Sequence, residues 1–155
     1  MSDALENRVV LVTGGGRGLG RAMALALAQS GARVAITGAR AEGELAATVA
    51  EAGRRWGPGR MIAVRADVAD EGDCARAVQA TLDAFGGLDG LVNNAGRGMR
   101  LVSETFTTEP TKFWEVPPET WRLILDVNVT GVFLMTRAAT PHFLAQGFGK
   151  IVMIS

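Results

Sequence analysis

V-V-L-V-T-G-G-G-R-G-L-G, residues 9–20, is the stretch that decides the fold. An apolar run breaks into a cluster of glycines, and Leu19 then opens an alanine-rich helical pattern that ends near Ser30. This order predicts a strand, a tight turn and a helix. In such a unit, free backbone N–H groups and the positive end of the helix dipole face one point, which favours a bound phosphate. The stretch predicts a dinucleotide site, with a plain glycine-rich turn as the alternative.

The glycine spacing differs from the common pattern G-x-G-x-x-G. It is Thr13-Gly14-x-x-x-Gly18-x-Gly20, so the site needs support from elsewhere in the chain. That support is L-D-G-L-V-N-N-A-G, residues 88–96, an apolar run that ends in two asparagines, an alanine and a glycine. Because ligands of open α/β sheets bind at the carboxyl ends of the strands, we expect the two motifs to meet there.

The two motifs together resemble the short-chain dehydrogenase/reductase family. They occur in the family's order and about eighty residues apart, with Asp67-Val68 between them. The resemblance covers essentially all 155 residues. It implies an NAD(P)-dependent enzyme that transfers a hydride between nicotinamide and a carbonyl or alcohol substrate.

Strand-like and helix-like segments alternate, which predicts an α/β fold: a Rossmann-like, doubly wound parallel sheet of five strands with helices on both faces. The strands are expected near residues 8–13, 33–38, 60–66, 88–93 and 150–155, and the helices near 19–29, 41–53, 70–85 and 118–145. The continuous apolar strands are typical of a sheet covered on both faces. Ala22, Met23, Ala26 and Leu27 are expected to form the sheet-facing side of the first helix.

Residues 1–155 are interpreted as one dinucleotide-binding domain that is incomplete at its C-terminus. The last strand, residues 151–155, is fully apolar, which is typical of a sheet interior and hazardous at an edge. We therefore expect the N-terminal part of a longer protein, with the C-terminal part of the fold missing. Residues 97–117 are either a segment that faces substrate or a partner, or a surface loop held by Phe106, Phe113 and Trp114.

Composition excludes several classes of protein. Sixteen basic and sixteen acidic residues balance, so no basic field favours nucleic acid. The single cysteine, Cys74, excludes an internal disulfide and offers no metal cluster, and we expect it to be inert packing. The N-terminus lacks a signal-peptide core, and no apolar run approaches the roughly 20 residues of a membrane span. A cytoplasmic protein without metal or membrane attachment is expected.

The glycines have separate predicted roles. Gly14 gives the tight exit from the first strand, Gly18 lets the backbone approach the pyrophosphate, and Gly20 lets helix and strand pack closely. The resemblance implies that further residues line the cofactor; these are Gly15, Gly16, Arg17 and Leu19, Asp67 and Val68 beside the adenine, and Asn94, Ala95 and Gly96 beside the nicotinamide ribose. Asn93 and Thr13 are expected to stabilise the sheet. Asp67 could instead form a plain turn before the next helix, for which Asp70 is a candidate N-cap.

The end of the second strand predicts which dinucleotide binds. NAD-selective sites place a carboxylate there, but this chain has Gly38, Ala39 and Arg40. Arg17 adds a second guanidinium, and two such groups suit the 2′-phosphate of NADP(H). NADP(H) is therefore predicted over NAD(H), with two solvated surface arginines as the alternative.

The family's active site consists of an Asn, a Ser, a Tyr and a Lys four residues after the Tyr. Asn128 matches the first of these, although an asparagine bonded to a neighbouring carbonyl is the alternative. The chain has no tyrosine, and neither Lys112 nor Lys150 stands where the family's lysine would. By the family's register Ser155 precedes the catalytic serine, and His142 is expected to have a surface role.

The complete protein is therefore expected to be an enzyme, while this chain alone is expected to be inactive. It would act on a small carbonyl or alcohol substrate and form a homo-oligomer, a dimer or tetramer, as family members usually do. The alternative function is a catalytically inactive dinucleotide-binding or interaction module. The residues after Ser155 would discriminate the two: a serine followed by Y-x-x-x-K indicates the enzyme.

Overall fold

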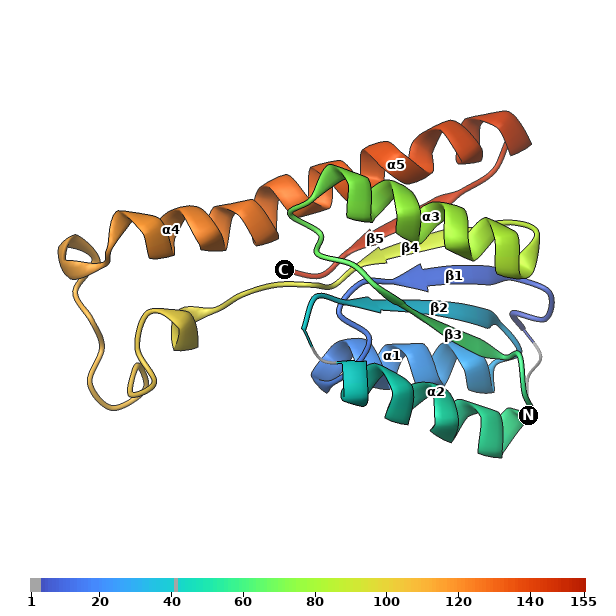
Figure 1. Cartoon of the computed structure of the whole chain (residues 1–155), viewed down its shortest axis with the longest axis horizontal. Helices are drawn as coiled ribbons and strands as arrows, with labels where there is room; N and C mark the ends of the chain where they lie inside the picture. Colours follow the sequence, from blue (N-terminus) through green and yellow to red (C-terminus); the bar gives the residue numbers. More distant parts are fainter. Residues whose placement is uncertain (1–3, 41) are drawn as a thin grey trace.

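Five parallel strands form one sheet in a computed structural model that describes residues 4–40 and 42–155. The strands are β1 (Val9–Val12), β2 (Arg33–Gly38), β3 (Met61–Arg65), β4 (Gly90–Asn93) and β5 (Lys150–Met153). Their order across the sheet is β3-β2-β1-β4-β5, with every neighbouring pair parallel (Figure 1). The predicted five-stranded, Rossmann-like sheet is confirmed.

Helices cover both faces of this sheet. They are α1 (Gly18–Gln29), α2 (Glu42–Trp56), α3 (Glu71–Phe85), α4 (Pro118–Leu125) and α5 (Gly131–Gln146), with short 3-10 turns η1 (Met99–Leu101) and η2 (Phe113–Glu115) and a π-helical turn η3 (Asp126–Thr130). The helices α1 and α2 lie on one face, and α3 and α5 on the other (Figure 1). A buried apolar cluster lies under each pair of helices.

The helix α1 presents only part of the predicted face to the sheet: Met23 and Leu27 pack against the buried cluster, but Ala22 and Ala26 do not. Its buried residues are Gly20, Ala24, Leu25 and Ala28, whereas Ala22 and Ala26 are exposed. Almost every position of this helix is apolar, so the sequence shows no polar stripe from which to read its rotation. The close approach of the helix start to the glycine turn decides the rotation instead.

Helix ends follow local side-chain chemistry. Asp70 caps α3, since its Oδ1 accepts a hydrogen bond from the Asp73 amide at 2.8 Å. Gly31 follows α1 with a positive φ of 98°, as expected for a glycine that ends a helix. The helix α2 continues to Trp56 rather than ending at residue 53, and residue 41 of its predicted start lies outside the described residues.

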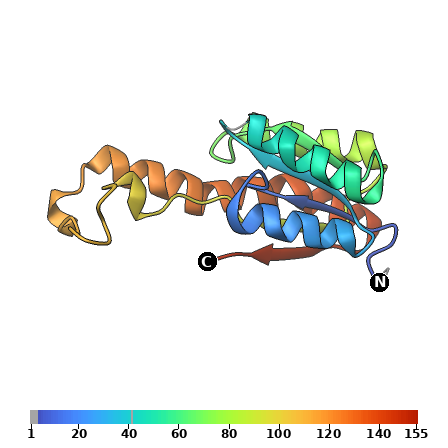
Figure 2. The same cartoon turned by 90° about the horizontal axis from the view of Figure 1, so that it is seen from below.

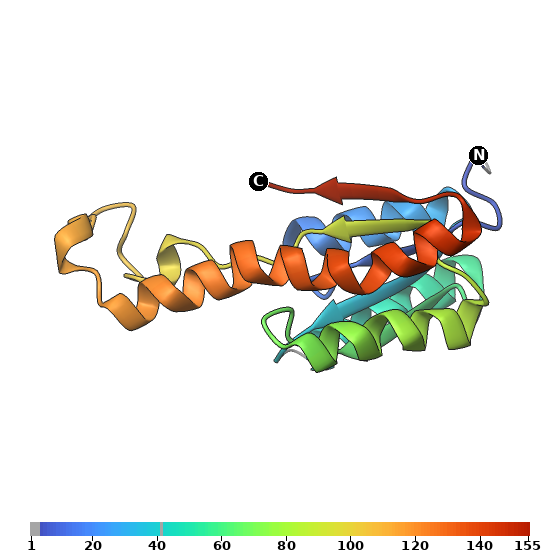
Figure 3. The same cartoon turned by 90° about the horizontal axis from the view of Figure 1, so that it is seen from above.

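Residues 118–146 form one long helical run through α4, η3 and α5 (Figure 3). Pro118 occupies its first turn, and the run continues past Pro141, as predicted. By length and composition alone this run could cross a membrane, with a mean hydropathy of 1.3 over its best window, so the expectation that no segment qualifies is wrong on these two criteria. Helices that cover a sheet meet the same criteria, and α5 packs against α3 and β4.

Burial differs from the prediction at both edges of the sheet. All four residues of β5 are exposed, and β3 alternates between covered and more open positions. In Figure 2, β5 lies at the edge, with α1 above it and without a helix on its other side. The prediction of strands covered on both faces holds for β1 and for most of β2 and β4, because only these interior strands have neighbours on both sides.

The segment 97–117 projects beyond the sheet together with α4 (Figure 1). Phe113 is 84% exposed and Trp114 is 67% exposed, with their rings edge to face at 5.2 Å between centroids. Phe113 and Trp114 therefore do not hold the loop as that interpretation expects, since their rings contact each other, while Phe106 is half-buried.

Candidate functional site

A cavity of about 520 Å³ opens at the carboxyl ends of β1, β2, β3 and β4. The strand β1 lies between β2 and β4, and the helices that precede these two neighbours, α1 and α3, cover opposite faces of the sheet. This is the switch point where open α/β sheets bind ligands. The cavity is lined by Gly14, Gly16, Arg17, Gly18, Leu19, Gly20, Thr37, Gly38, Ala39, Arg40, Glu44, Leu45, Ala66, Asp67, Val68, Asn94, Ala95, Gly96, Arg97 and Val127. All predicted cofactor residues except Gly15 are among them.

The turn between β1 and α1 requires glycine for two different reasons. Gly14 has a φ of 67°, a conformation that side chains rarely adopt. At Gly20 a Cβ atom would overlap the Gly14 carbonyl oxygen and the Asn94 amide nitrogen. At Gly18, in contrast, a Cβ would meet nothing within 4 Å, so this position faces open space at the cavity. These placements are consistent with the separate roles predicted for Gly14, Gly18 and Gly20. The contacts of these glycines with a cofactor stay predictions.

Gly15 is the predicted cofactor residue that the structure places elsewhere. Its amide donates to the Thr37 carbonyl at 3.0 Å, and a Cβ there would approach the Ile36 side chain to 2.5 Å. Gly15 is buried against β2 and does not line the cavity. Its role is to dock the glycine turn on the neighbouring strand, which a sequence without contact information cannot indicate.

Thr13 joins the two sequence motifs. This buried residue follows β1, and its Oγ1 accepts hydrogen bonds from the amides of Asn94 and Ala95, each at 2.9 Å. In the other direction, the Asn94 side-chain amide donates to the Thr13 carbonyl at 2.9 Å and to the Gly14 carbonyl at 3.3 Å. The glycine turn and the end of β4 are thus held together by side chains from both motifs.

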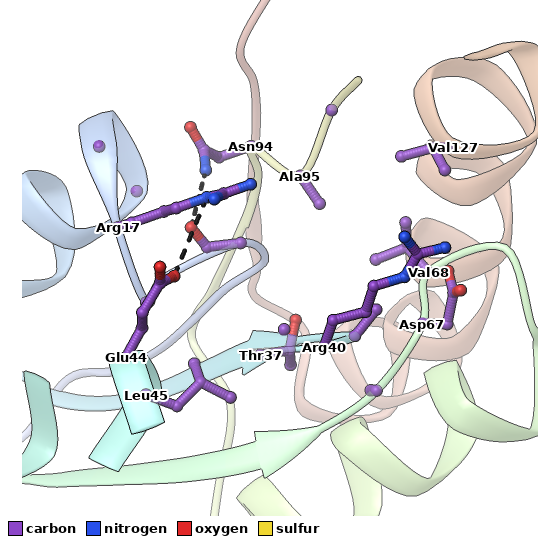
Figure 4. Close-up of a pocket in the computed structure, with 18 of the residues that line it drawn as sticks. Arg17, Thr37, Arg40, Glu44, Leu45, Asp67, Val68, Asn94, Ala95 and Val127 are labelled. Carbon is purple, nitrogen blue, oxygen red and sulfur yellow. Dashed lines mark hydrogen bonds and ion pairs between the residues drawn. The ribbon is translucent and has the colours of Figure 1, made fainter. Parts of the chain in front are cut away.

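Asn93 and Asn94 have distinct positions although they are adjacent. Asn93 is buried and donates to the Thr136 hydroxyl of α5 at 3.1 Å, consistent with the predicted structural role. Asn94 lines the cavity, but its amide nitrogen is committed to the glycine turn (Figure 4). Asn94 therefore shapes the cavity wall, and contact with a nicotinamide ribose stays a prediction for it.

Two guanidinium groups reach the cavity from different elements. Arg17 comes from the glycine turn and Arg40 from the end of β2 (Figure 4). The Arg17 side chain is 83% exposed, and its Nε lies 3.9 Å from Oε2 of Glu44 in the first turn of α2. Arg40 forms no ion pair with the residues that the structure describes. The structure brings the two predicted arginines to one cavity, and adds a carboxylate that the sequence analysis did not select.

Asp67 and Val68 follow β3 and line the cavity beside Arg40, across from Arg17 (Figure 4). The Asp67 Oδ1 accepts from the Ala69 amide at 3.0 Å, so a local turn contact coexists with its position at the cavity. The Asp67 amide donates to Oδ2 of Asp73 at 2.8 Å. This hydrogen bond, followed by the one from Arg76, lowers the pKa of the Asp73 carboxyl.

Asn128 lies at the centre of the π-helical turn η3, and its neighbour Val127 lines the cavity. The Asn128 Nδ2 donates to the Arg97 carbonyl at 2.8 Å, and its Oδ1 accepts from the Arg97 amide at 2.7 Å. The amide thus fixes the backbone just after Gly96. The alternative of an asparagine bonded to a neighbouring carbonyl is what the structure contains, and a catalytic role for Asn128 stays a prediction.

The remaining candidate groups lie away from the cavity. Cys74 is fully buried, its Sγ donates to the Val68 carbonyl at 3.3 Å, and desolvation raises the pKa of its thiol to about 11, all of which fits inert packing. Ser155 is exposed at the end of β5. His142 is half-buried and not a freely exposed surface residue. Its Nε2 is enclosed and has no hydrogen-bond partner among the described residues.

The residues present fit a dinucleotide. One wall is formed by glycines at which an added Cβ atom would crowd neighbouring atoms, and the backbone at Gly18 is open toward the cavity. Thr37, near the end of β2 and to the left of Arg40 in Figure 4, has a buried Oγ1 without a partner among the described residues. Buried polar atoms are normally satisfied, so an orphaned hydroxyl in a cavity wall points to a polar ligand. Thr37 and Glu44 are the functional candidates that sequence reasoning missed, and only their places beside the cavity identify them.

Comparison with known proteins gives consistent matches. The family model of short chain dehydrogenases matches residues 8–155. The chain is 39% identical over 152 residues to a 3-oxoacyl-[acyl-carrier-protein] reductase of Synechocystis, covering 98% of this chain and 57% of the relative. It is 41% identical to a 2-(R)-hydroxypropyl-CoM dehydrogenase of Xanthobacter autotrophicus, covering 96% and 56%.

Solved structures agree in fold. A 3-ketoacyl-(acyl-carrier-protein) reductase from Brucella melitensis, complexed with NADH, has a TM-score of 0.83 and 37% identity, over 97% of this chain and 57% of that one. A short chain dehydrogenase from Burkholderia cenocepacia, in complex with NADP, has a TM-score of 0.79 and 36% identity, over 96% and 55%. The chain thus spans somewhat more than half the length of these relatives. With the model matching nearly the whole chain, the protein belongs to the short-chain dehydrogenase/reductase family of oxidoreductases.

Proposed function

We propose that the whole protein is an NADP(H)-dependent oxidoreductase that transfers a hydride between nicotinamide and a small carbonyl or alcohol substrate. The observation that carries the proposal is the Thr13–Asn94 junction, which holds the glycine turn and the end of β4 at one cavity. We further propose that the whole protein is cytoplasmic and forms a homo-oligomer, as members of its family usually do. The relatives named above include reductases and a dehydrogenase.

The residues of this chain have assignable parts in the proposal. The turn from Gly14 to Gly20 would hold the pyrophosphate with its backbone amides and the start of α1. Arg17 and Arg40 would contact the 2′-phosphate, and Asp67 and Val68 would border the adenine. The bound cofactor would supply or accept the hydride. The chain contains no tyrosine, so the family's tyrosine acid/base has no counterpart among these residues.

Preference for NADP(H) is supported by charge at the end of β2. A carboxylate that accepts from the ribose 2′-OH is the mark of an NAD site, and Gly38, Ala39 and Arg40 supply none. A guanidinium binds phosphate through two parallel N–H donors, and both Arg17 and Arg40 line the cavity. Relatives of this chain have been solved with NADH and with NADP, so family membership alone does not decide the cofactor.

The test is titration of the full-length protein with NADPH and NADH, for the wild type and for the double variant Arg17→Ala/Arg40→Ala. Both side chains are exposed, so each contact to the 2′-phosphate is expected to contribute about 1 kcal/mol, and the double variant should weaken NADPH binding by about 30-fold. NADH affinity should change less than about threefold. Arg55→Ala is the matched control, because Arg55 pairs with Glu51 on α2 and does not line the cavity.

Equal losses for both coenzymes would refute the NADP(H) assignment. A carbonyl-substrate screen of the same protein with the preferred coenzyme then tests the reaction. Tight coenzyme binding without turnover of any carbonyl or alcohol would instead support the alternative of an inactive dinucleotide-binding module.

A further inference from the structure

Glu44 is a carboxylate in the wall of a cavity that otherwise favours anions. It lies in the first turn of α2 and lines the same cavity as Arg17 and Arg40 (Figure 4). The residue packs closely against the glycine turn: a Cβ atom added at Gly16 would lie only 3.3 Å from the Glu44 Cβ. The Thr48 hydroxyl links the two segments, since it can donate a hydrogen bond to the Gly16 carbonyl at 3.3 Å and to the Glu44 carbonyl at 2.9 Å. The start of α2 therefore cannot swing away from the glycine turn without breaking these contacts.

The Glu44 carboxylate already engages one of the two phosphate-binding candidates. Its Oε2 lies 3.9 Å from the Arg17 Nε, and the Glu44 side chain is 44% exposed. An arginine that faces a carboxylate must give up part of that attraction when it turns its donors to a phosphate. The same carboxylate repels a dianionic group that enters beside it.

We propose that Glu44 is a specificity-determining residue that limits the preference for a 2′-phosphorylated dinucleotide by competing for Arg17. This inference rests on the proposed function, in which Arg17 contacts the 2′-phosphate. The ion pair holds Arg17 in the free protein, and phosphate binding displaces Glu44 from it. The ratio of NADPH affinity to NADH affinity is then smaller than the ratio that Arg17 and Arg40 would give in the absence of the Glu44 carboxylate.

The chain offers a matched control two residues away. Glu42 lies in the same first turn of α2, but its Oε1 pairs with Arg65 Nη1 at 3.1 Å. Neither Glu42 nor Arg65 lines the cavity. Glu42→Gln and Glu44→Gln therefore remove the same charge from the same helix turn, and only the second changes the proposed competition.

The experiment is titration of the full-length protein with NADPH and NADH, monitored by coenzyme fluorescence at low and high salt. The wild type is compared with Glu44→Gln, Glu42→Gln, Arg17→Ala and the double variant Arg17→Ala/Glu44→Gln. Exposed ion pairs are weak, so Glu44→Gln should tighten NADPH binding by about fivefold at low salt and less at high salt. NADH affinity should change less than twofold, and Glu42→Gln should change neither affinity by more than twofold.

The double variant separates competition from simple repulsion. Once Arg17 is removed, Glu44→Gln should gain less than about twofold for NADPH, because nothing remains to compete for. An unchanged NADPH affinity in Glu44→Gln would overturn the proposal. So would an equal gain for NADH, or a full fivefold gain in the absence of Arg17.

Failure of this inference is distinguishable from failure of the NADP(H) assignment. If Arg17→Ala weakens NADPH selectively while Glu44→Gln has no effect, the assignment stands and the role of Glu44 is rejected. If Arg17→Ala leaves NADPH affinity unchanged, the role of Glu44 is rejected, and the NADP(H) assignment is decided by the double variant Arg17→Ala/Arg40→Ala. Thermal unfolding of each variant shows whether Glu44→Gln, which keeps the side-chain length, leaves the fold intact.

Discussion

Replacing Thr13 with valine should destabilise the junction between the two motifs. Valine keeps the shape and the β-branch of threonine, so packing and strand propensity are preserved. The change removes the Oγ1 atom that accepts from the amides of Asn94 and Ala95, each at 2.9 Å. Thr13 is 1% exposed, so water cannot replace the lost acceptor without rearrangement.

The magnitude follows from the two amides left without a partner. An unsatisfied buried donor costs about 1–3 kcal/mol, and both amides are only partly buried, so Thr13→Val should lower the free energy of unfolding by about 2–4 kcal/mol. Thr13→Ser is the control, because it keeps the hydroxyl and loses one methyl group, at about 1 kcal/mol. The same junction places the glycine turn, so Thr13→Val should also weaken coenzyme binding.

The assay is urea unfolding of the full-length protein, with the midpoint and slope measured by tryptophan fluorescence, to which three tryptophans of this chain contribute. If Thr13→Val stays within about 0.5 kcal/mol of the wild type, the buried hydroxyl does not stabilise the junction as argued. A loss in Thr13→Ser as large as that in Thr13→Val would point to the methyl group instead.

Three further predictions follow from single contacts. Gly20→Ala should abolish detectable coenzyme binding, because the new Cβ would overlap the Gly14 carbonyl. Gly53→Ala is the control: Gly53 lies in open space on α2, so this change should raise the free energy of unfolding by about 0.5–1 kcal/mol. Equal urea midpoints and equal coenzyme affinities for the two variants would contradict this prediction. The Cys74 thiol, with its pKa raised from an ordinary 9.0 to about 11, should resist a disulfide reagent in the folded state. Its contribution to stability should be constant below pH 9 and be lost between pH 9 and 11, because the unfolded chain loses this proton first; a Cys74→Ala variant with the same slope over this range would refute the assignment. Asn128→Ala should free the backbone after Gly96 and cost about 1–2 kcal/mol in urea unfolding, and an unchanged midpoint would show that its two bonds are not stabilising.

Much of the fold was readable from short-range chemistry. The continuous apolar runs of β1 and β2, the capping aspartate Asp70 and the helix-ending Gly31 act within a few residues, so the sequence predicts them directly. The two motifs were also recognisable, because glycine and asparagine at fixed spacings leave few alternative structures. The rotation of α1 was predicted only in part, because a helix that is apolar at almost every position carries little periodic signal.

The sequence by itself determined the order of strands and helices, the parallel α/β class and the residues from which a coenzyme site could be built. Only the tertiary structure decided which of these residues share a cavity. It placed Gly15 against β2, tied Asn94 and Asn128 to backbone groups, and brought Glu44 to Arg17. The physical reason is that such contacts join residues from 22 to more than 80 positions apart, where spacing along the chain carries no information about distance in space.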